Sequence, residues 1–322
     1  MIGRALISAR AARTVQRPSL CDVLLWMAGD TFHWLHNGHH HYPPAPGEES
    51  LTDMHIRHLR QFLGDRVKIF QFNKDQERQN GADWELWIHN RSHGVGLRIQ
   101  AKKASKQRRY PFAHVVKGTN ADQCALLLQH ALKVRCVPVY LLYNHWEWDG
   151  ADLEAEAEAE QAGFLCGHGV DDPARHGATL LSAYRVASEI QRKGAGHNLR
   201  HRALWPESLP WNRVLCDCRA VNGTSHQVLT GVADAVKGLV RTGMPASTSS
   251  EEQAESVGGI LRDGPNRLPQ HVVRLLESHE AEPPPPPVPT TTTMLVDVGD
   301  DPEQTHTWEF MGCVRPSGPA RR

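Results

Sequence analysis

The segment that most constrains this chain is VPVYLLYNHW, at residues 137–146. It is apolar on both faces of an extended strand, which is typical of a strand buried in the middle of a sheet. A strand of this kind needs a packing layer above it and another below it. The segment therefore indicates an α/β domain in which helices cover both faces of a sheet.

The periodicity of the surrounding sequence predicts a mixed central sheet flanked by helices. Apolar positions recur at helical spacing in some segments and alternate in others, and Gly94 suggests a hairpin turn between two of the strands. The order along the chain is helix, three strands, helix and strand, which predicts one mixed α/β sheet. The expected helices are 18–35, 49–63, 121–133, 178–193 and 268–280, and the expected strands are 69–73, 83–89, 96–102 and 137–143.

The composition indicates one α/β domain with a low-complexity segment at each end of the chain. Segments without periodic apolar residues cannot offset the entropy lost on ordering, so we expect them to be disordered or flexible. The expected division is a disordered N-terminus at 1–17, an α/β domain at 18–230 with its core at 49–146, a flexible linker at 231–262, a C-terminal helix and edge strand at 263–300, and a disordered tail at 301–322.

Charge and cysteine usage exclude several classes of protein. Lys plus Arg equals Asp plus Glu at 36 each, so no global basic field points to a nucleic acid. The seven cysteines form no CxxC pair, which favours a reducing, cytoplasmic setting. No apolar run is long enough to span a membrane, and the sequence has no P-loop, GxGxxG or GxSxG motif.

Four polar side chains interrupt two neighbouring strands of the expected sheet. Asp83 and Glu85 lie two residues apart on one strand, and Gln100 and Lys102 lie two residues apart on the next. Because side chains alternate along a strand, each pair shares a face. If the strands form a hairpin, the four groups converge while Trp84, Leu86, Ile99 and Ala101 point into the core.

This set of groups suits phosphodiester hydrolysis. Carboxylate and amide oxygens hold a hard cation such as Mg²⁺, or Mn²⁺ in its place. Such a cation lowers the pKa of its bound water and offsets the charge that develops on the phosphate. A lysine beside it can stabilise the transition state electrostatically.

The D-x-E…Q-x-K arrangement resembles the PD-(D/E)XK nuclease superfamily, in particular its Mrr-like branch, in which glutamine replaces the second acid. The resemblance covers residues 49–146 and implies a restriction-endonuclease-like core. ESLTD at 49–53, the stretch from Phe72 to Trp87, QAK at 100–102 and YNHW at 143–146 are also similar to an uncharacterised bacterial domain family, which implies no activity.

The nuclease resemblance implies a role for each residue of the pattern. Asp83 would hold the metal, Gln100 would occupy the second ligand position, and Lys102 would be the catalytic lysine. The superfamily often adds a glutamate from the first core helix, for which Glu49 is the candidate and Asp53 the alternative. This chain departs from the pattern because Ala82, not proline, precedes Asp83, and because Gln100 is neutral; Glu85 or Glu49 would supply the missing charge.

A basic stretch follows the expected hairpin and suggests how substrate is held. The candidate substrate contacts are Lys103, Lys106, Arg108, Arg109 and, at the start of the next helix, Gln123. Cationic side chains beside a nuclease site are suited to contacting phosphates. We therefore expect a nucleic-acid partner, DNA before RNA, with a role in restriction, repair or phage defence implied by the resemblance alone; a homodimer stays open.

Two other interpretations remain at this point. Asp83, Glu85, Gln100 and Lys102 could form the solvent face of an edge hairpin, with Glu85 and Lys102 as an ordinary cross-strand ion pair. The domain could also be a catalytically inactive nucleic-acid- or protein-binding module on the same fold. Outside this region, the histidine run at 39–41 is expected to be a solvated loop.

Overall fold

The computed structural model describes ten stretches of the chain. They are residues 20–72, 82–112, 122–145, 173–193, 199–215, 224–243, 260–261, 264–278, 287–288 and 292–299. The expected disordered ends at 1–17 and 301–322 lie outside these residues.

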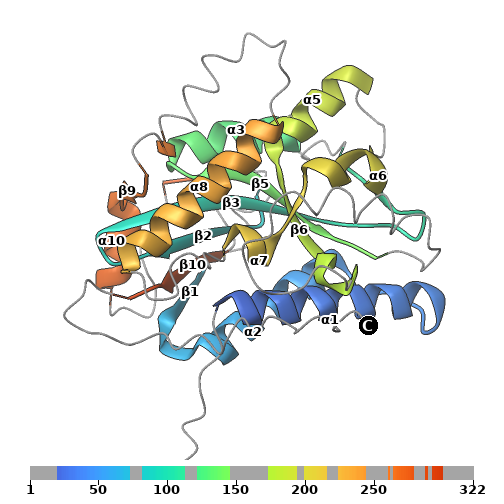
Figure 1. The fold of residues 1–322 in the computed structure, drawn as a ribbon, viewed down its shortest axis with the longest axis horizontal. Coiled ribbons are helices and arrows are strands. Elements are labelled where there is room, and N and C mark those ends of the chain that lie inside the picture. The colour runs from blue at the N-terminus through green and yellow to red at the C-terminus, as the bar shows by residue number, and fades with distance from the viewer. Residues whose placement is uncertain are drawn as a thin grey trace, which may run out of the picture.

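One mixed sheet runs through the described structure, and helices cover both of its faces (Figure 1). This confirms the expected α/β class. The strand order is β1-β10-β2-β3-β5-β6-β8, with β9 paired to β3 and a separate β4–β7 ribbon. The strands are β1 Val67–Gln71, β2 Trp84–His89, β3 His93–Lys103, β4 Arg109–Tyr110, β5 Val137–Tyr143, β6 Ala178–Ser182, β7 Leu199–Arg200, β8 Leu209–Pro210, β9 Asn266–Arg267 and β10 Thr292–Asp297.

The helices form two layers. On one face α1 and α2 lie side by side, and α7 and α8 pack on the same core cluster; α3, α5 and α10 pack on the opposite face (Figure 1). None of the described helices is long and apolar enough to cross a membrane. The helices are α1 Leu20–His40, α2 Glu48–Leu63, α3 Gln123–Lys133, α5 Ala183–Lys193, α6 His201–Leu204, α7 Trp211–Val214, α8 Ser225–Gly243 and α10 Gln270–Glu277.

The centre of the sheet is the strand pair that carries the candidate site. β2 pairs antiparallel with β3, with Trp84 opposite Ile99, and β3 pairs parallel with β5. Every residue of β5 is buried, as expected for a central strand. The four strands predicted to share one sheet do so, in the order of helix, three strands, helix and strand that the sequence indicated.

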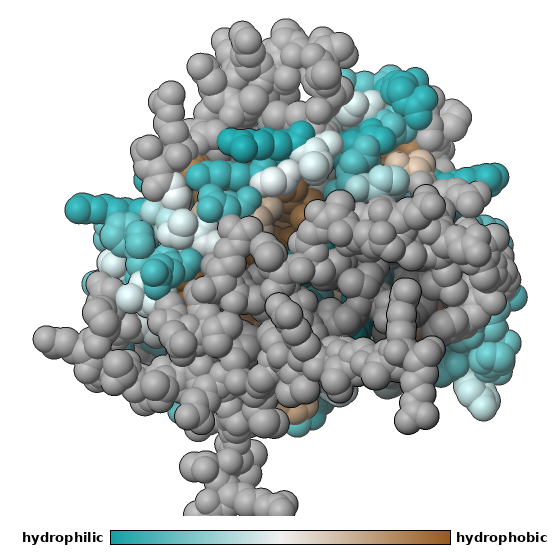
Figure 2. Space-filling view, viewed as in Figure 1, coloured by the Kyte–Doolittle hydropathy of each residue, from teal (hydrophilic) through white to brown (hydrophobic). Residues whose placement is uncertain are grey.

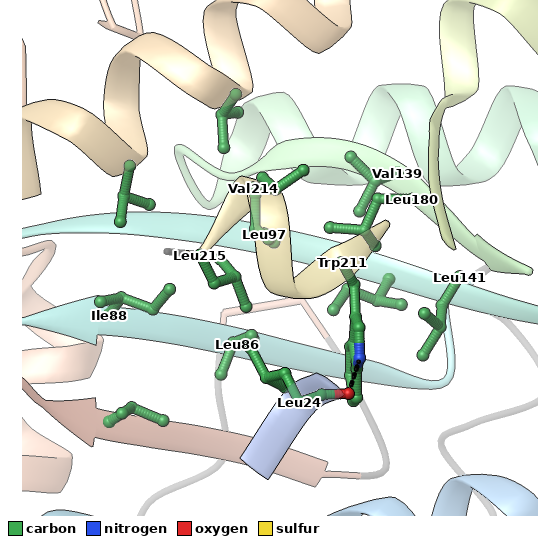
Figure 3. Close-up of a cluster of buried hydrophobic side chains, with 14 of the residues drawn as sticks. Leu24, Leu86, Ile88, Leu97, Val139, Leu141, Leu180, Trp211, Val214 and Leu215 are labelled. Atoms are coloured by element: carbon green, nitrogen blue, oxygen red, sulfur yellow. Dashed lines mark hydrogen bonds between the residues drawn. The ribbon is translucent and has the colours of Figure 1, made fainter. Parts of the chain in front are cut away.

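The main core lies between the sheet and the α1/α2/α7/α8 layer (Figure 3). Leu86 and Ile88 from β2, Leu97 from β3 and Leu141 from β5 lie in one cluster with Trp211 and Val214 of α7. The Trp211 indole nitrogen donates to the Leu24 carbonyl oxygen at 2.8 Å, which fixes α7 against α1. On the face shown in Figure 2, the described surface is largely hydrophilic, and apolar residues show mainly in a central patch beside α8.

The C-terminal strand is not the edge strand that its sequence suggested. β10 lies inside the sheet, antiparallel to β1 and parallel to β2. Both of its backbone edges are therefore paired, and five of its six residues are buried. The expectation was wrong because the partners of a strand are set by contacts remote in sequence, which local periodicity does not report.

Two local expectations also need correction. Residues 231–243 belong to α8 and not to a linker, because Val232, Val236 and Leu239 recur at helical spacing and pack into the core. Residues 178–182 form strand β6, and only the remainder of the expected helix at 178–193 is helical. Ile260 and Leu261 of the expected linker are buried in the main core, and residues 244–259 and 262 lie outside the described residues.

The hairpin turn also differs from the expected one. It falls at residues 90–92, where Arg91 has a φ of 65°. Gly94 is instead a residue of β3 and pairs with His89 of β2. A Cβ on Gly94 would lie 2.8 Å from the Ile88 carbonyl oxygen and from the Leu268 side chain. Gly94 is therefore required by close packing and not by a left-handed turn.

The α1–α2 contact contains a buried histidine with a strongly altered pKa. His55 Nε2 lies 2.6 Å from Thr31 Oγ1, and that hydroxyl donates to the Met27 carbonyl oxygen, so Nε2 carries the proton. Burial, with a smaller effect of His58, lowers the pKa of His55 from 6.5 to about 3. His55 therefore stays neutral in the folded protein and charges only when the chain unfolds.

This altered pKa predicts a loss of stability in mild acid. Below pH 6.5 the unfolded chain binds a proton at His55 that the folded protein does not, so the free energy of unfolding falls as pH falls toward 3. Between pH 7 and pH 5 the His55 contribution to this free energy should fall by about 2 kcal/mol. Urea denaturation of wild type and His55→Gln at both pH values measures it, and parallel pH curves for the two proteins would contradict the assignment.

Candidate active site

Asp83 lies immediately before β2 and is held by β3. Its backbone N–H donates to the Ile99 carbonyl oxygen at 2.9 Å, which extends the β2–β3 pairing by one residue. Its Oδ2 accepts hydrogen bonds from the Ala101 backbone N–H and from Gln100 Nε2, both at 2.7 Å. The carboxylate is therefore fixed in position beside the polar face of β3.

Gln100 links Asp83 to the next helix. Gln123, the first residue of α3, donates from Nε2 to Gln100 Oε1 at 2.9 Å. Asp122 caps that helix by accepting from the Cys124 backbone N–H at 3.2 Å. Asp83, Gln100 and Gln123 thus form a continuous chain of hydrogen bonds, which brings the start of α3 to this end of β3.

Lys102 and the following residue connect β3 to the start of α2. Lys102 Nζ is buried and lies 3.7 Å from Glu48 Oε1. The Lys103 backbone N–H donates to Glu48 Oε2 at 2.9 Å, and Lys103 Nζ donates to the Pro46 carbonyl oxygen at 2.7 Å. These contacts bring Glu48 to the same end of β3 as Gln100 and Lys102.

The environment of Asp83 disfavours its charged form. Burial and the neighbouring Glu48 carboxylate raise its pKa from 3.8 to about 7, against the opposing effects of the Ala101 hydrogen bond, Lys102 and Gln100. A buried carboxylic acid near a second one, with a pKa close to neutral, is typical of functional sites. Glu48, Asp83, Gln100 and Lys102 therefore form one site, which we call the β3 site.

A comparison with family models places the chain among known sequences. Residues 20–298 match the model of a family described as a family of unknown function, DUF6615. The chain belongs to this family. The resemblance to an uncharacterised domain family is thereby shown, whereas the comparison carries no evidence on nuclease activity. A search of curated proteins finds no match.

In this DUF6615 member Glu85 does not join the β3 site. It is fully buried two residues further along β2, where Oε2 lies 3.1 Å from Arg98 Nη1. Its Oε1 accepts from Trp87 Nε1 at 2.6 Å and lies 3.0 Å from His271 Nε2 of α10. Alternation correctly placed Glu85 on the face of Asp83, but the register sets it opposite Arg98, so it is not placed as a ligand with Asp83.

The glutamate that reaches the site from α2 is Glu48 and not the expected Glu49. Glu49 and the alternative Asp53 are exposed, whereas Glu48 lies one turn before the buried Thr52 and two turns before the buried His55. Residues at these spacings share a helix face. The phase of the apolar residues in α2 could therefore have identified Glu48 from the sequence.

Of the expected substrate contacts, Lys103 and Gln123 touch the β3 site, and Arg109 lies on the separate β4–β7 ribbon. Lys106 and Arg109 are exposed, whereas Lys103 and Arg108 are half-buried. The histidine run at 39–41 is not wholly a solvated loop, because His39 and His40 end α1 and the His39 ring centroid lies 4.5 Å from that of His145. The solvent-exposed edge-hairpin interpretation is wrong, because Glu85, Gln100 and Lys102 are buried in a central strand pair.

The β3 site offers oxygen donors to a hard divalent cation. Glu48 and Asp83 supply carboxylates. Gln100 faces Asp83 with its Nε2 and Gln123 with its Oε1, so its amide must turn before the oxygen can join them. The raised pKa of Asp83 beside Glu48 shows two acids whose mutual repulsion a cation would offset. Among the described residues no group of three or more His, Cys, Asp or Glu side chains could hold a metal ion, consistent with a donor set that has only two acids.

Because Glu85 and Arg98 form a buried ion pair, replacing one partner should destabilise the protein more than replacing both. Arg98→Met leaves the Glu85 charge buried without its guanidinium partner, which should lower the free energy of unfolding by about 3–5 kcal/mol. The matched double variant, Glu85→Gln with Arg98→Met, removes both charges and should recover most of this loss. Urea denaturation of the three proteins tests it; a double variant less stable than the single one would contradict this account.

The raised pKa of Asp83 predicts that its removal stabilises the metal-free protein. Ionising Asp83 opposes folding, so the stability cost of this carboxylate grows as pH rises from about 4 to about 7. In EDTA at pH 8, Asp83→Asn should be more stable than wild type by up to about 4 kcal/mol, with the difference shrinking in acid. Thermal denaturation at several pH values measures this, and a variant less stable at pH 8 would refute it.

Proposed function

We propose that this protein is a metal-dependent nuclease that hydrolyses phosphodiester bonds, DNA being the first substrate to test. The observation that carries the proposal is the meeting of four side chains at one end of the sheet: Glu48 from α2, Asp83 from the residue before β2, and Gln100 and Lys102 from β3. This arrangement resembles the PD-(D/E)XK superfamily, with glutamine in place of the second acid. The superfamily often adds a glutamate from the first core helix. Here Glu48, and not the expected Glu49, lies at that position.

Each residue of the β3 site has a role that follows from its position. Glu48 and Asp83 would hold a Mg²⁺ or Mn²⁺ ion through carboxylate oxygens, and Gln100 would add its amide oxygen once that amide turns away from Gln123. When bound, that ion lowers the pKa of water and offsets phosphate charge. Lys102 keeps its ammonium group in a buried position, where a fixed positive charge stabilises developing negative charge more strongly than it would in water.

The hydrogen-bond chain positions these groups before substrate arrives. The Ala101 backbone and Gln100 fix the Asp83 carboxylate, and Gln123 fixes the amide of Gln100. Preorganised groups need little reorganisation during the reaction, which is why such networks support catalysis. The same network would also suit an inactive nucleic-acid- or protein-binding module, and cleavage assays separate the two.

Lys102→Ala tests the catalytic assignment. Wild type should cleave a mixture of plasmid and single-stranded DNA with Mg²⁺ or Mn²⁺ and not with EDTA. Loss of the Lys102 charge, which acts mainly in the transition state, should reduce the cleavage rate by about 10²–10³-fold. Circular dichroism and thermal denaturation verify that the variant folds.

The matched control is Lys68→Ala, which removes a lysine from the same sheet. Lys68 lies on β1 and its Nζ donates to the Leu276 carbonyl oxygen, so it is remote from the β3 site. Its removal should leave the cleavage rate unchanged. Cleavage by wild type in EDTA, or a Lys102→Ala variant that retains the wild-type rate, would exclude the assigned mechanism; a folded wild type without cleavage would favour the binding module.

A further inference from the structure

Three segments of the chain meet beside one end of β3: the end of α1, the turn after β3 and the residues after β5. The Ala104 backbone N–H donates to the Tyr143 carbonyl oxygen at 2.9 Å, so the chain that leaves β3 runs beside the chain that leaves β5. His145 lies two residues after β5, and His39 lies in the last turn of α1. The centroids of these two rings are 4.5 Å apart, at an interplanar angle of 35°. We call His39 and His145 the histidine pair.

One nitrogen of each ring is held by a backbone carbonyl group. His145 Nε2 lies 3.0 Å from the Ser105 carbonyl oxygen, which can only accept a hydrogen bond, so Nε2 carries the proton. His39 forms a hydrogen bond with the backbone of Ala104 that favours its protonated form, as a carbonyl acceptor does. Among the described residues His39 Nε2 has no hydrogen-bond partner, so the donor to Ala104 is Nδ1. Two successive carbonyl groups of the chain thus fix the tautomer of both rings.

The second nitrogen of each ring is buried without a partner. Within the part of the chain that the structure describes, no hydrogen bond reaches His39 Nε2 or His145 Nδ1. Burial lowers the pKa of both rings, that of His145 to about 4, so both are neutral at physiological pH and each of these nitrogens carries a lone pair. Buried polar atoms without partners are rare and costly, which points to a ligand here. That ligand must be a hydrogen-bond donor or a metal ion, which excludes a phosphate or a carboxylate.

A transition-metal ion fits these two nitrogens. Zn²⁺ binds imidazole nitrogen at about 2.0–2.1 Å, and two rings on one ion, at an angle of about 90–110°, have centroids about 4.5–5 Å apart. The observed 4.5 Å lies in this range. Histidine ligands of metals usually donate their other nitrogen to a carbonyl or carboxylate oxygen, which is the arrangement that Ser105 and Ala104 provide. Because both nitrogens are buried, a single ion can reach them where a larger hydrogen-bond donor cannot.

The surrounding charges favour an ion held by coordination over one held by charge alone. Lys103 and Lys106 act on His39, and their positive charges oppose any cation. The Glu48 carboxylate partly offsets Lys103, and the end of α1 presents the negative end of its helix dipole. A hard ion such as Mg²⁺ prefers oxygen and gains little from two imidazoles, whereas Zn²⁺ and similar ions bind imidazole nitrogen well. The histidine pair is therefore suited to an ion of the zinc type.

We propose that His39 and His145 together bind one divalent transition-metal ion of the zinc type. Among the described residues no third His, Cys, Asp or Glu side chain completes the site, so water fills the other positions and the ion is exchangeable. The ion joins the end of α1 to the chain that leaves β5. The inference does not depend on the proposed nuclease function, because neither histidine belongs to the β3 site.

Zinc binding to the full chain tests the inference without requiring cleavage. Zn²⁺ is titrated in competition with a chromophoric zinc chelator, in a large excess of Mg²⁺ that occupies sites for hard cations. Wild type should bind one zinc ion more than His39→Ala, and one more than His145→Ala. Zinc held elsewhere, for example by thiol groups, stays bound in both variants and is subtracted by the comparison. Zn²⁺ should also raise the melting temperature of wild type and not that of His39→Ala, because an ion that binds only the folded protein stabilises it.

Two control variants should keep the zinc ion. His33→Ala removes an exposed histidine of α1, and the six residues from His33 to His39 turn the helix by about 240°, so His33 lies on another face. Asp83→Asn removes a carboxylate of the β3 site and leaves the histidine pair intact. Circular dichroism verifies the fold of every variant. His145 is buried whereas His39 is half-buried at a helix end, so His39→Ala decides the matter if His145→Ala does not fold.

The outcomes distinguish this inference from the proposed function. Equal zinc binding by wild type and His39→Ala would overturn the inference. Loss of the zinc ion in Asp83→Asn, or its displacement by Mg²⁺, would also overturn it, by placing the ion in the β3 site. Zinc bound through His39 by a protein that cleaves no DNA would reject the nuclease and keep the histidine pair, whereas cleavage without His39-dependent zinc binding would do the reverse.

Discussion

The buried polar face of β3 is the constraint on which the rest of this structure depends. Arg98, Gln100 and Lys102 alternate with core residues on a strand that is buried along nearly its whole length. A buried polar group that lacks a partner is costly, so each of the three requires one. Glu85, Asp83 with Gln123, and Glu48 meet these requirements, and they come from β2, α3 and α2.

These partners also organise the architecture around the strand. Arg98 holds Glu85, which in turn contacts His271 of α10. Glu48 ties the start of α2 to the end of β3, and Gln123 ties the start of α3 to its middle. The polar network therefore ties helices to both ends of β3, and at one end it holds Asp83 in surroundings that disfavour its charged form.

The sequence predicts the face of each strand residue better than its partner. Alternation placed Asp83, Gln100 and Lys102 together, because a period of two is a property of the strand itself. The role of Glu85 could not be decided in that way, since the two-residue spacing says nothing of Arg98 directly opposite. Glu48 was recoverable from the phase of α2, whereas the interior position of β10 depends on pairings remote along the chain and was not.

The interior position of β10 has a consequence for biosynthesis. β10 pairs Thr292 with Trp84, the neighbour of Asp83, about two hundred residues earlier in the chain. During synthesis β2 and β3 leave the ribosome long before β10. One edge of β2 therefore stays unpaired until β10 has been made. Pairing across such a separation is slow, and the nascent domain passes through a stage with an open sheet edge. A stop codon placed just before residue 292 would therefore remove an interior strand from the sheet, with consequences unlike those of trimming a tail.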